Sequence, residues 1–141
     1  MKLSAVRSLG LILMVALSIA ACGDYQIRLP GGHYLARVYA GAFLIVKDRD
    51  GRGLGGDVVV NASVDSYQVL DGLIVGHVST LDYMSPEEKE VSKPGYFILN
   101  AKTHEVKEGL DKKAWLDALR ALGVNNGPRL SKPSRFDRDY Q

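Results

Sequence analysis

Between residues 34 and 107, apolar residues come in short runs that alternate with polar ones and stop at glycine, proline or polar turns. Alternation of this kind is typical of strands with one buried face, and Asp71-Gly72 between two runs favours a tight hairpin. Successive strands joined by short turns pair antiparallel. The runs are 34–39, 42–47, 58–60, 64–70, 73–80, 95–101 and 105–107. They predict a small antiparallel sheet of about five or six strands, and closure of these strands into a small barrel is the alternative.

One helix is expected between Asp111 and Gly123. Asp111 suits the N-cap, Gly123 suits a left-handed C-terminal position, and Trp115, Leu119 and Leu122 repeat at helical spacing on one face. We expect Trp115 to anchor this helix on the sheet. Strands followed by a helix predict the α+β class, with one C-terminal helix packed on the antiparallel sheet.

The first residues form a leader pattern. Lys2 and Arg7 precede an uncharged apolar stretch, 9–21, of about a dozen residues, which is shorter than the roughly 20 that a membrane-spanning helix needs. A basic start followed by a short apolar stretch is typical of an export signal peptide.

The end of this leader, Ile19-Ala20-Ala21-Cys22, resembles the lipobox of bacterial lipoproteins. The resemblance implies cleavage between Ala21 and Cys22, a diacylglycerol on the Cys22 thiol, and often an acyl chain such as palmitate on its amine. Cys22 is the only cysteine, so no disulfide can form within the chain. An ordinary export signal with a chance cysteine and an uncleaved anchor are the alternatives.

The resemblance also implies a lipid-anchored location in the cell envelope. Gly23, rather than an aspartate, directly follows Cys22, which favours the outer membrane, facing the periplasm, if the host has two membranes. Without the leader's Lys2 and Arg7, the 18 basic residues fall to 16, equal to the 16 acidic residues. A neutral domain has no broad positive field, so we expect no nucleic-acid partner.

The expected organisation has four parts: signal peptide 1–21, tether 22–33, α+β domain 34–124, and a disordered or loosely held tail 125–141. Charge, Pro128, Pro133 and few aliphatic residues indicate the tail. Residues 24–34 and 95–123 are similar to small bacterial lipoproteins of uncharacterised function, which implies no catalytic residues.

Metal and cofactor motifs are weak. Gly51–Gly56 lacks the Lys-Ser/Thr ending of a phosphate loop, and the Asp48 and Asp50 pattern has Val59 where a calcium loop needs glutamate. The histidines lie far apart in the sequence, at His33, His77 and His104. We therefore expect the glycine-rich segment and the Asp48 and Asp50 segment to form hairpin turns, and we expect the protein to hold no cofactor and no metal.

Two functions remain open. The first is a non-catalytic binding domain that contacts an envelope protein through tyrosines and a histidine on its surface. That surface would comprise Tyr39, Tyr67, His77 and Tyr96. The second is a small hydrolase or ligand-binding protein that uses Asp65, Ser66 and His77, which the predicted hairpin brings near one another.

Overall fold

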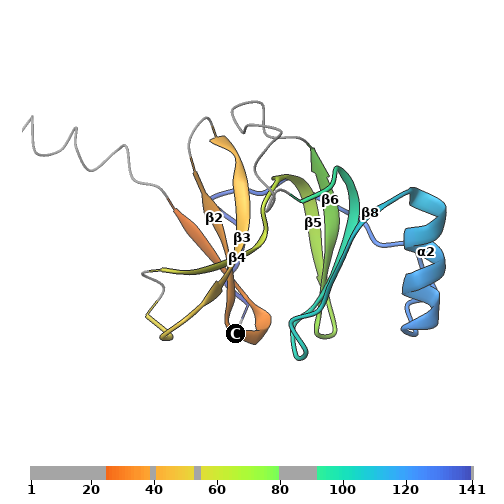
Figure 1. Cartoon of the computed structure of the whole chain (residues 1–141), viewed down its shortest axis with the longest axis horizontal. Helices are drawn as coiled ribbons and strands as arrows, with labels where there is room; N and C mark the ends of the chain where they lie inside the picture. The colour runs from red at the N-terminus through yellow and green to blue at the C-terminus, as the bar shows by residue number, and fades with distance from the viewer. Residues whose placement is uncertain (1–24, 39–40, 53–54, 80–91, 141) are drawn as a thin grey trace, which may run out of the picture.

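The computed structural model describes residues 25–38, 41–52, 55–79 and 92–140. Its described part contains two four-stranded antiparallel sheets and a helix (Figure 1). The first sheet has the order β1 (Gln26–Leu29), β2 (His33–Arg37), β3 (Phe43–Asp48) and β4 (Gly56–Val60). The second has the order β5 (Ser63–Leu70), β6 (Leu73–Ser79), β7 (Gly95–Asn100) and β8 (Val106–Leu110). Helix α2 (Lys112–Ala121) follows β8.

The expectation of one sheet with five or six strands is therefore wrong in detail, although mostly antiparallel strands with a C-terminal helix are confirmed. Strand β5 does not pair with β4 but begins the second sheet after Asn61 and Ala62. Each sheet has one strongly apolar face, and stacking the sheets buries both faces at once. Sequence alternation marks such faces without saying which strands share a sheet.

The β5–β6 hairpin has the turn that the sequence predicts. Leu70 pairs with Leu73 across the two-residue loop. Asp71 and Gly72 have φ of +31° and +81°. Positive φ at both central positions is the geometry whose twist matches that of the flanking strands.

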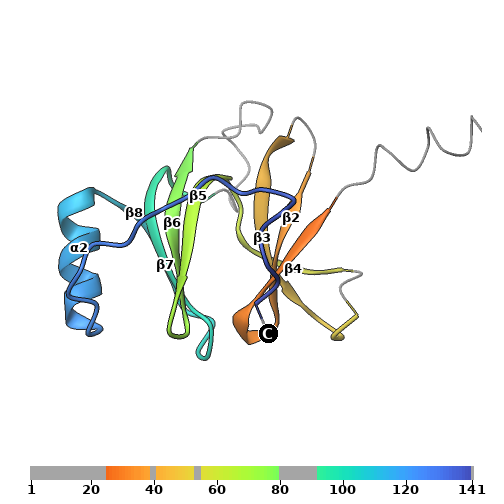
Figure 2. The ribbon, with the colours of Figure 1, turned by 180° about the vertical axis from the view of Figure 1, so that it is seen from behind.

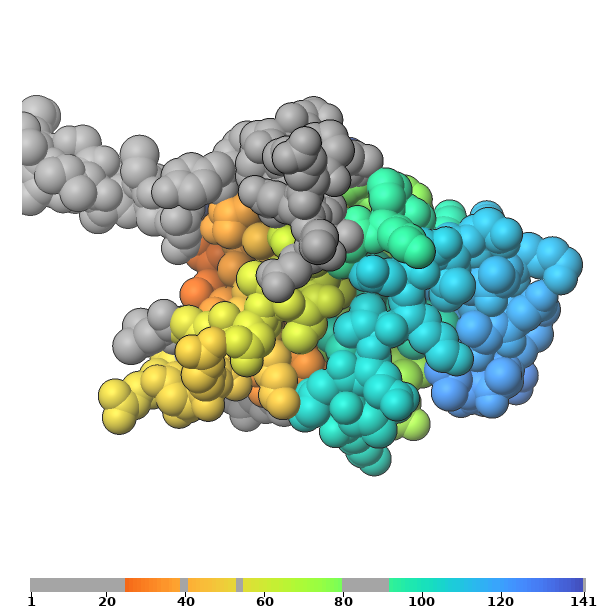
Figure 3. Space-filling model, viewed as in Figure 1, coloured from red at the N-terminus to blue at the C-terminus, as the bar shows by residue number. Residues whose placement is uncertain are grey.

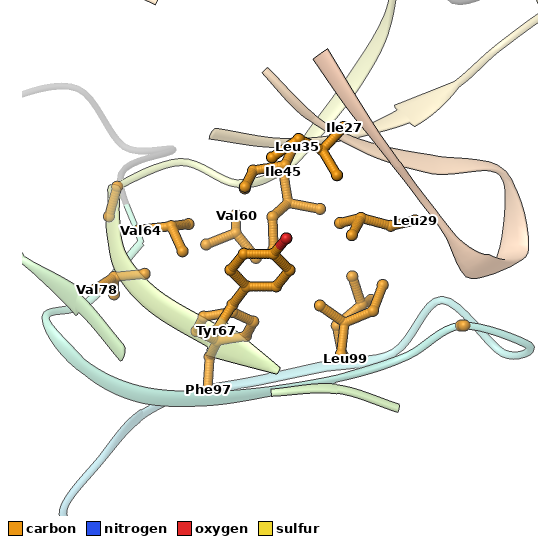
Figure 4. Packing of buried hydrophobic residues seen from close by; sticks show 13 residues of the cluster. Ile27, Leu29, Leu35, Ile45, Val60, Val64, Tyr67, Val78, Phe97 and Leu99 are labelled. Atoms are coloured by element: carbon orange, nitrogen blue, oxygen red, sulfur yellow. The ribbon is translucent and has the colours of Figure 1, made fainter. Parts of the chain in front are cut away.

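The main core lies between the two sheets (Figure 4). Its members come from both sheets, from the β4–β5 link and from the turn after β7, and they are almost fully buried. They are Ile27, Leu29, Leu35, Ile45, Val60, Ala62, Val64, Tyr67, Ile74, Val78, Phe97, Leu99 and Ala101. Burial of this apolar surface is the main source of stability for the pair of sheets.

Helix α2 covers the other face of the second sheet and makes a third layer. The Asp111 side chain caps the helix by accepting a hydrogen bond from the Ala114 N–H at 2.8 Å. Trp115 and Leu119 are buried, and the indole N–H donates to the Phe97 carbonyl at 3.1 Å. Gly123 has φ +89° beyond the helix end. The predicted cap and Trp115 anchor are thus confirmed. No helix within the described residues is both long and apolar enough to traverse a bilayer.

The expected tether, 22–33, is wrong for its second half, because residues 26–29 form strand β1. Ile27 and Leu29 point into the core, whereas Gln26 and Arg28 are exposed. Four alternating residues are too short a signal to separate from a linker by sequence. Pairing with β2, where Ile27 faces Leu35, is what makes them a strand.

The expected disordered or loosely held tail is also wrong within residues 129–140, here called the C-terminal strap. Figure 2 shows the strap crossing from α2 over the second sheet to the first. Ser131 pairs with Tyr67 of β5 through two backbone hydrogen bonds, and the Tyr140 N–H donates to the Arg28 carbonyl of β1 at 2.8 Å. Both β5 and β1 are edge strands, whose unpaired backbone groups need such partners.

Candidate functional site

A β-bulge at the open end of the β5–β6 hairpin, away from the Asp71-Gly72 turn, brings polar side chains together. Val64 pairs with Val78, and the next pair is Ser66 with His77, so Asp65 is an extra residue in β5. The bulge lets Val64 and Tyr67, three residues apart, both enter the core. It also brings the Asp65 side chain to His77 on the outer face of the second sheet. Helix α2 covers another part of the same face.

Asp65 bonds two side chains of β6. Its Oδ2 lies 3.0 Å from His77 Nδ1, and its Oδ1 accepts a hydrogen bond from the Ser79 hydroxyl at 2.9 Å. The side chains of His77 and Asp65 are 38% and 41% exposed, so a partner can reach both. Asp65, His77 and Ser79 are called the Asp65 cluster below.

The Asp65 cluster continues into an aromatic row. His77 and Tyr96 are cross-strand partners, and their rings meet edge to face with centroids 4.8 Å apart. Tyr96 stacks on Trp115 with centroids 4.7 Å apart. The buried indole of α2 therefore supports the tyrosine, which in turn supports the imidazole.

The residues predicted for a hydrolase are only partly brought together. Asp65 and His77 are in contact as the hairpin predicts. Ser66 faces His77 in register, but within the described residues the serine that bonds the carboxylate is Ser79. Ser79 lies two residues from His77 on the same strand, so period-two alternation is the signal for it. Nothing in the sequence marks the bulge.

This arrangement differs from a serine–histidine–aspartate triad. In a triad the serine hydroxyl bonds the imidazole nitrogen that faces away from the carboxylate. Here the Ser79 hydroxyl donates to Asp65 itself. The Asp65 cluster offers a carboxylate and an imidazole, with the Tyr96 ring beside them, which suits hydrogen bonding to a polar group on a partner.

The predicted tyrosine surface is corrected at one position. Tyr67 is only 3% exposed, and its hydroxyl donates to Asp137 Oδ2 at 2.8 Å. Burial, followed by the bond to Asp137, raises the Tyr67 pKa. Tyr67 is thus a core residue that fastens the strap, because the bulge turns its side chain inward. Tyr39 lies outside the described residues, while His77 and Tyr96 are partly exposed.

A second concave site lies on the first sheet, beside the 3-10 turn η2 (Pro30–Gly32). This pocket of about 310 Å³ is lined by η2, by the strand residues Arg28, Tyr34 and Asp48, and by Tyr140 of the strap. Burial, with smaller effects of Asp48 and Asp50, raises the Tyr34 pKa. The sequence did not single out this pocket, because residues from β1, β3 and the strap meet only in the fold.

Two of the three histidines meet at the same end of the molecule. Buried His33 has its Nδ1 2.9 Å from the Pro30 carbonyl oxygen and its Nε2 3.3 Å from His104 Nδ1. The pair joins the start of β2 to the turn after β7 and so bridges the two sheets. Across the described residues, no group of three or more metal-ligating side chains is gathered.

The aspartates considered as a calcium loop form a turn. The Asp48 carboxylate accepts from the Asp50 N–H at 3.3 Å, and Asp50 accepts from the Arg52 N–H at 3.2 Å. Arg49 forms an exposed ion pair with Asp57 at 2.6 Å. These short-range bonds stabilise a turn between β3 and β4.

In comparisons with known proteins, no protein-family profile, curated protein or solved structure matches this chain.

Proposed function

We propose that this protein is a lipid-anchored cell-envelope protein whose β-sandwich is a non-catalytic binding domain. The observation that carries the proposal is the short distance in sequence between Cys22, at the end of the lipobox-like segment, and Tyr25. The Tyr25 carbonyl already accepts a hydrogen bond from the Arg37 N–H at 3.2 Å. Three residues span at most about 11 Å, so a lipid on Cys22 holds the folded domain directly at a membrane surface.

The strength of such an anchor depends on its acyl chains. Each buried methylene contributes about 0.8 kcal/mol, so one chain binds reversibly, whereas two or three hold the protein stably. Gly23 after Cys22 favours the outer membrane, facing the periplasm, in a host with two membranes. In a host with one membrane the domain faces the exterior.

We propose that the envelope partner is a protein that contacts the Asp65 cluster and Tyr96. Partly exposed polar and aromatic groups on a rigid sheet are typical of recognition surfaces. Support by Trp115 keeps the Tyr96 ring in place before binding. Anchoring at the membrane raises the local concentration of the domain for such a partner.

The anchor is tested by mass spectrometry of the N-terminal peptide of protein purified from membranes. We expect a peptide that begins at Cys22 and carries diacylglycerol, with or without a further acyl chain. Cys22→Ser is the matched control and is expected to keep residues 1–21 and carry no lipid. A wild-type peptide that begins elsewhere or has an unmodified cysteine would refute the anchor.

The partner surface is tested by photo-crosslinking in cells from a photoreactive residue at Ser66 or Tyr96. A control at Val58 samples another exposed site, on β4 of the first sheet. We expect one protein adduct from positions 66 and 96 and none from 58. Equal adducts at all three positions, or adducts at 58 alone, would contradict the surface.

The contact between Asp65 and His77 favours one alternative, a small hydrolase. The Ser79 hydroxyl weighs against it, because this hydroxyl donates to the Asp65 carboxylate and not to the imidazole that would activate a nucleophile. A panel of ester, peptide and glycoside substrates tests this alternative. Turnover that is lost in both Asp65→Asn and His77→Gln, while the fold is retained, would replace the binding proposal.

A further inference from the structure

A groove lies where the folded domain begins. Tyr25 opens it before β1, and Phe43 and Arg37 line it from the adjoining end of the β2–β3 pair. Arg135 and Phe136 of the strap form its other side. The Tyr25 and Phe43 rings meet edge to face at 5.7 Å, and the Arg37 guanidinium lies 5.9 Å from the Tyr25 ring centroid. These five residues are called the anchor-proximal groove.

Phe136 is the most exposed of the large hydrophobic side chains in the described residues, at 87%. Its backbone is nevertheless held, because the Phe136 N–H donates to the Ser134 hydroxyl at 3.2 Å. The Ser134 N–H in turn donates to Asp137 Oδ2 at 3.0 Å, and the same oxygen accepts from Tyr67. Together with the Tyr25 and Phe43 rings, Phe136 forms an apolar patch on a held backbone, and such patches mark interaction sites.

The charged residues that line the groove, among those described, are positive. Arg37 and Arg135 line it, and none of its described lining residues is acidic. The nearest acidic residue along the strap, Asp137, has a carboxylate oxygen directed to Tyr67 and to the backbone of Ser134. Two guanidinium groups beside the exposed Phe136 ring and the partly buried Tyr25 and Phe43 rings complement phosphate groups above an apolar layer.

We propose that the anchor-proximal groove docks on the anionic phospholipid surface of the membrane that holds the protein. Phe136 enters the boundary between headgroups and acyl chains, and Arg37 and Arg135 contact lipid phosphates. This inference rests on the proposed lipid at Cys22, which lies three residues from Tyr25 and so keeps Tyr25, at one side of the groove, within about 11 Å of the anchored cysteine.

Docking in this way sets the orientation of the domain. Helix α2 forms the end of the molecule opposite the first sheet (Figure 3). With the start of β1 at the membrane, α2 and the adjoining outer face of the second sheet point away from the bilayer. The Asp65 cluster then stays accessible to a protein partner.

The test uses lipidated, full-length protein in vesicles whose lipids carry brominated acyl chains, which quench tryptophan on contact. Trp115 is the only tryptophan, and it is 2% exposed and packs between α2 and the second sheet. Wild-type fluorescence is therefore expected to be unquenched, whereas the added tryptophan of Phe136→Trp is expected to be quenched. Leu122→Trp, at the 49% exposed C-cap of α2, is the matched control and is expected to stay unquenched.

Lipid charge tests the arginines. We expect stronger quenching of Phe136→Trp with phosphatidylglycerol than with phosphatidylcholine alone. Adding Arg37→Gln and Arg135→Gln is expected to remove this difference, since each arginine near an anionic surface changes membrane affinity about fivefold. Quenching that is equal in both lipids and unaffected by the arginine changes would overturn the role of anionic headgroups.

The two proposals fail in different ways. If Cys22 carries lipid but the added tryptophan of Phe136→Trp is not quenched, the docking proposal is overturned and the anchor proposal stands. A protein adduct from a photoreactive residue at position 136, without quenching, assigns the groove to a protein instead. An unmodified Cys22 peptide refutes the anchor. Docking of the groove is then tested separately, by whether added brominated phosphatidylglycerol vesicles quench unlipidated Phe136→Trp protein.

Discussion

Gly31 shows how a single residue joins the two sheets. It lies in η2 with φ +73°, and a Cβ built on it falls 2.0 Å from the Ala101 carbonyl oxygen after β7. Its neighbour Gly32 has almost the same φ, +74°, but open space around it. Substitution of Gly32 therefore tests the cost of a left-handed backbone alone, whereas substitution of Gly31 tests that cost together with the close approach between the sheets.

Replacement of these glycines by alanine is the corresponding prediction. Gly32→Ala is expected to lower the free energy of unfolding by about 1 kcal/mol, because alanine disfavours positive φ. Gly31→Ala is expected to lower it by about 1–3 kcal/mol more, because η2 and Ala101 must also move apart. Urea unfolding measures both, and equal values for the two variants would contradict the contact.

His33 makes stability depend on pH. Burial chiefly, together with nearby His104 and Lys47, lowers its pKa, and the bond to the Pro30 carbonyl opposes this only in part. A histidine with a lowered folded-state pKa contributes stability above its unfolded value of about 6.5, and this contribution is lost as pH falls. Protonation would also remove the lone pair that faces His104.

We accordingly expect the melting temperature to fall as pH decreases from 7.5 to 5, followed by circular dichroism. His33→Gln removes the buried imidazole, and its melting temperature is expected to vary less with pH over this range. His77→Gln is the control, because His77 is partly exposed on the outer face. A steeper dependence in His33→Gln than in wild type would refute this origin of the pH effect.

At the scale of elements, one side chain fastens α2 to the second sheet. Trp115 packs with Leu73, Val75 and Ile98 and donates its N–H to the Phe97 carbonyl. A ten-residue helix is marginal in isolation, so its stability comes from this contact. The same tryptophan supports Tyr96 and through it His77.

Trp115→Ala is expected to lower the free energy of unfolding by about 3–5 kcal/mol, the usual cost of deleting a buried tryptophan. Trp115→Phe keeps most apolar contact and loses the N–H donor, so a loss smaller than that of alanine is expected. Chemical unfolding followed by far-UV circular dichroism measures both. A loss below about 1 kcal/mol for alanine would contradict the packing of α2.

At the scale of the whole molecule, the strap closes the open side of the sandwich. Its backbone pairs with Tyr67 on β5 and with Arg28 on β1, one edge strand from each sheet. Asp139 and Asp137 add bonds to the Arg28 N–H at 2.9 Å and to the Tyr67 hydroxyl at 2.8 Å. The strap thus adds a link between the two sheets to the chain connection at the β4–β5 corner.

Removing residues 129–141 is expected to lower the melting temperature markedly and to promote aggregation, because Tyr67 is uncovered and two strand edges are exposed. Phe136→Ala within the intact strap is the control and is expected to change stability by less than about 0.5 kcal/mol, since its ring is exposed. Differential scanning calorimetry and light scattering measure these effects. An unchanged melting temperature after truncation would show that the strap is not structural.

Local patterns predicted the parts of the fold whose causes are local. The Asp71-Gly72 hairpin follows from turn chemistry, the Asp111 cap follows from its side-chain acceptor, and the Trp115 anchor follows from helical spacing. Strand β1 and the strap were missed because each is stabilised by pairing with distant residues, Leu35 and Tyr67 respectively. Their own sequences are too short or too polar to indicate order.

The candidate site divides in the same way. Asp65 and His77 were expected to meet because they face each other across a hairpin, and they do. The choice of Ser79 over Ser66 and the burial of Tyr67 depend on the bulge at Asp65. A bulge is set by the need of Val64 and Tyr67 to share one core, which no local pattern expresses.

Local sequence is enough to predict the alternation of strands, the turn at Asp71-Gly72 and the amphipathic helix, because backbone conformation and side-chain periodicity act over a few residues. Long-range packing is what divides the strands into two sheets, buries Tyr67, and makes β1 and the strap parts of the domain. These outcomes depend on which apolar faces cover each other and which strand edges find partners. Such choices are made between segments far apart in the chain, after local structure has formed.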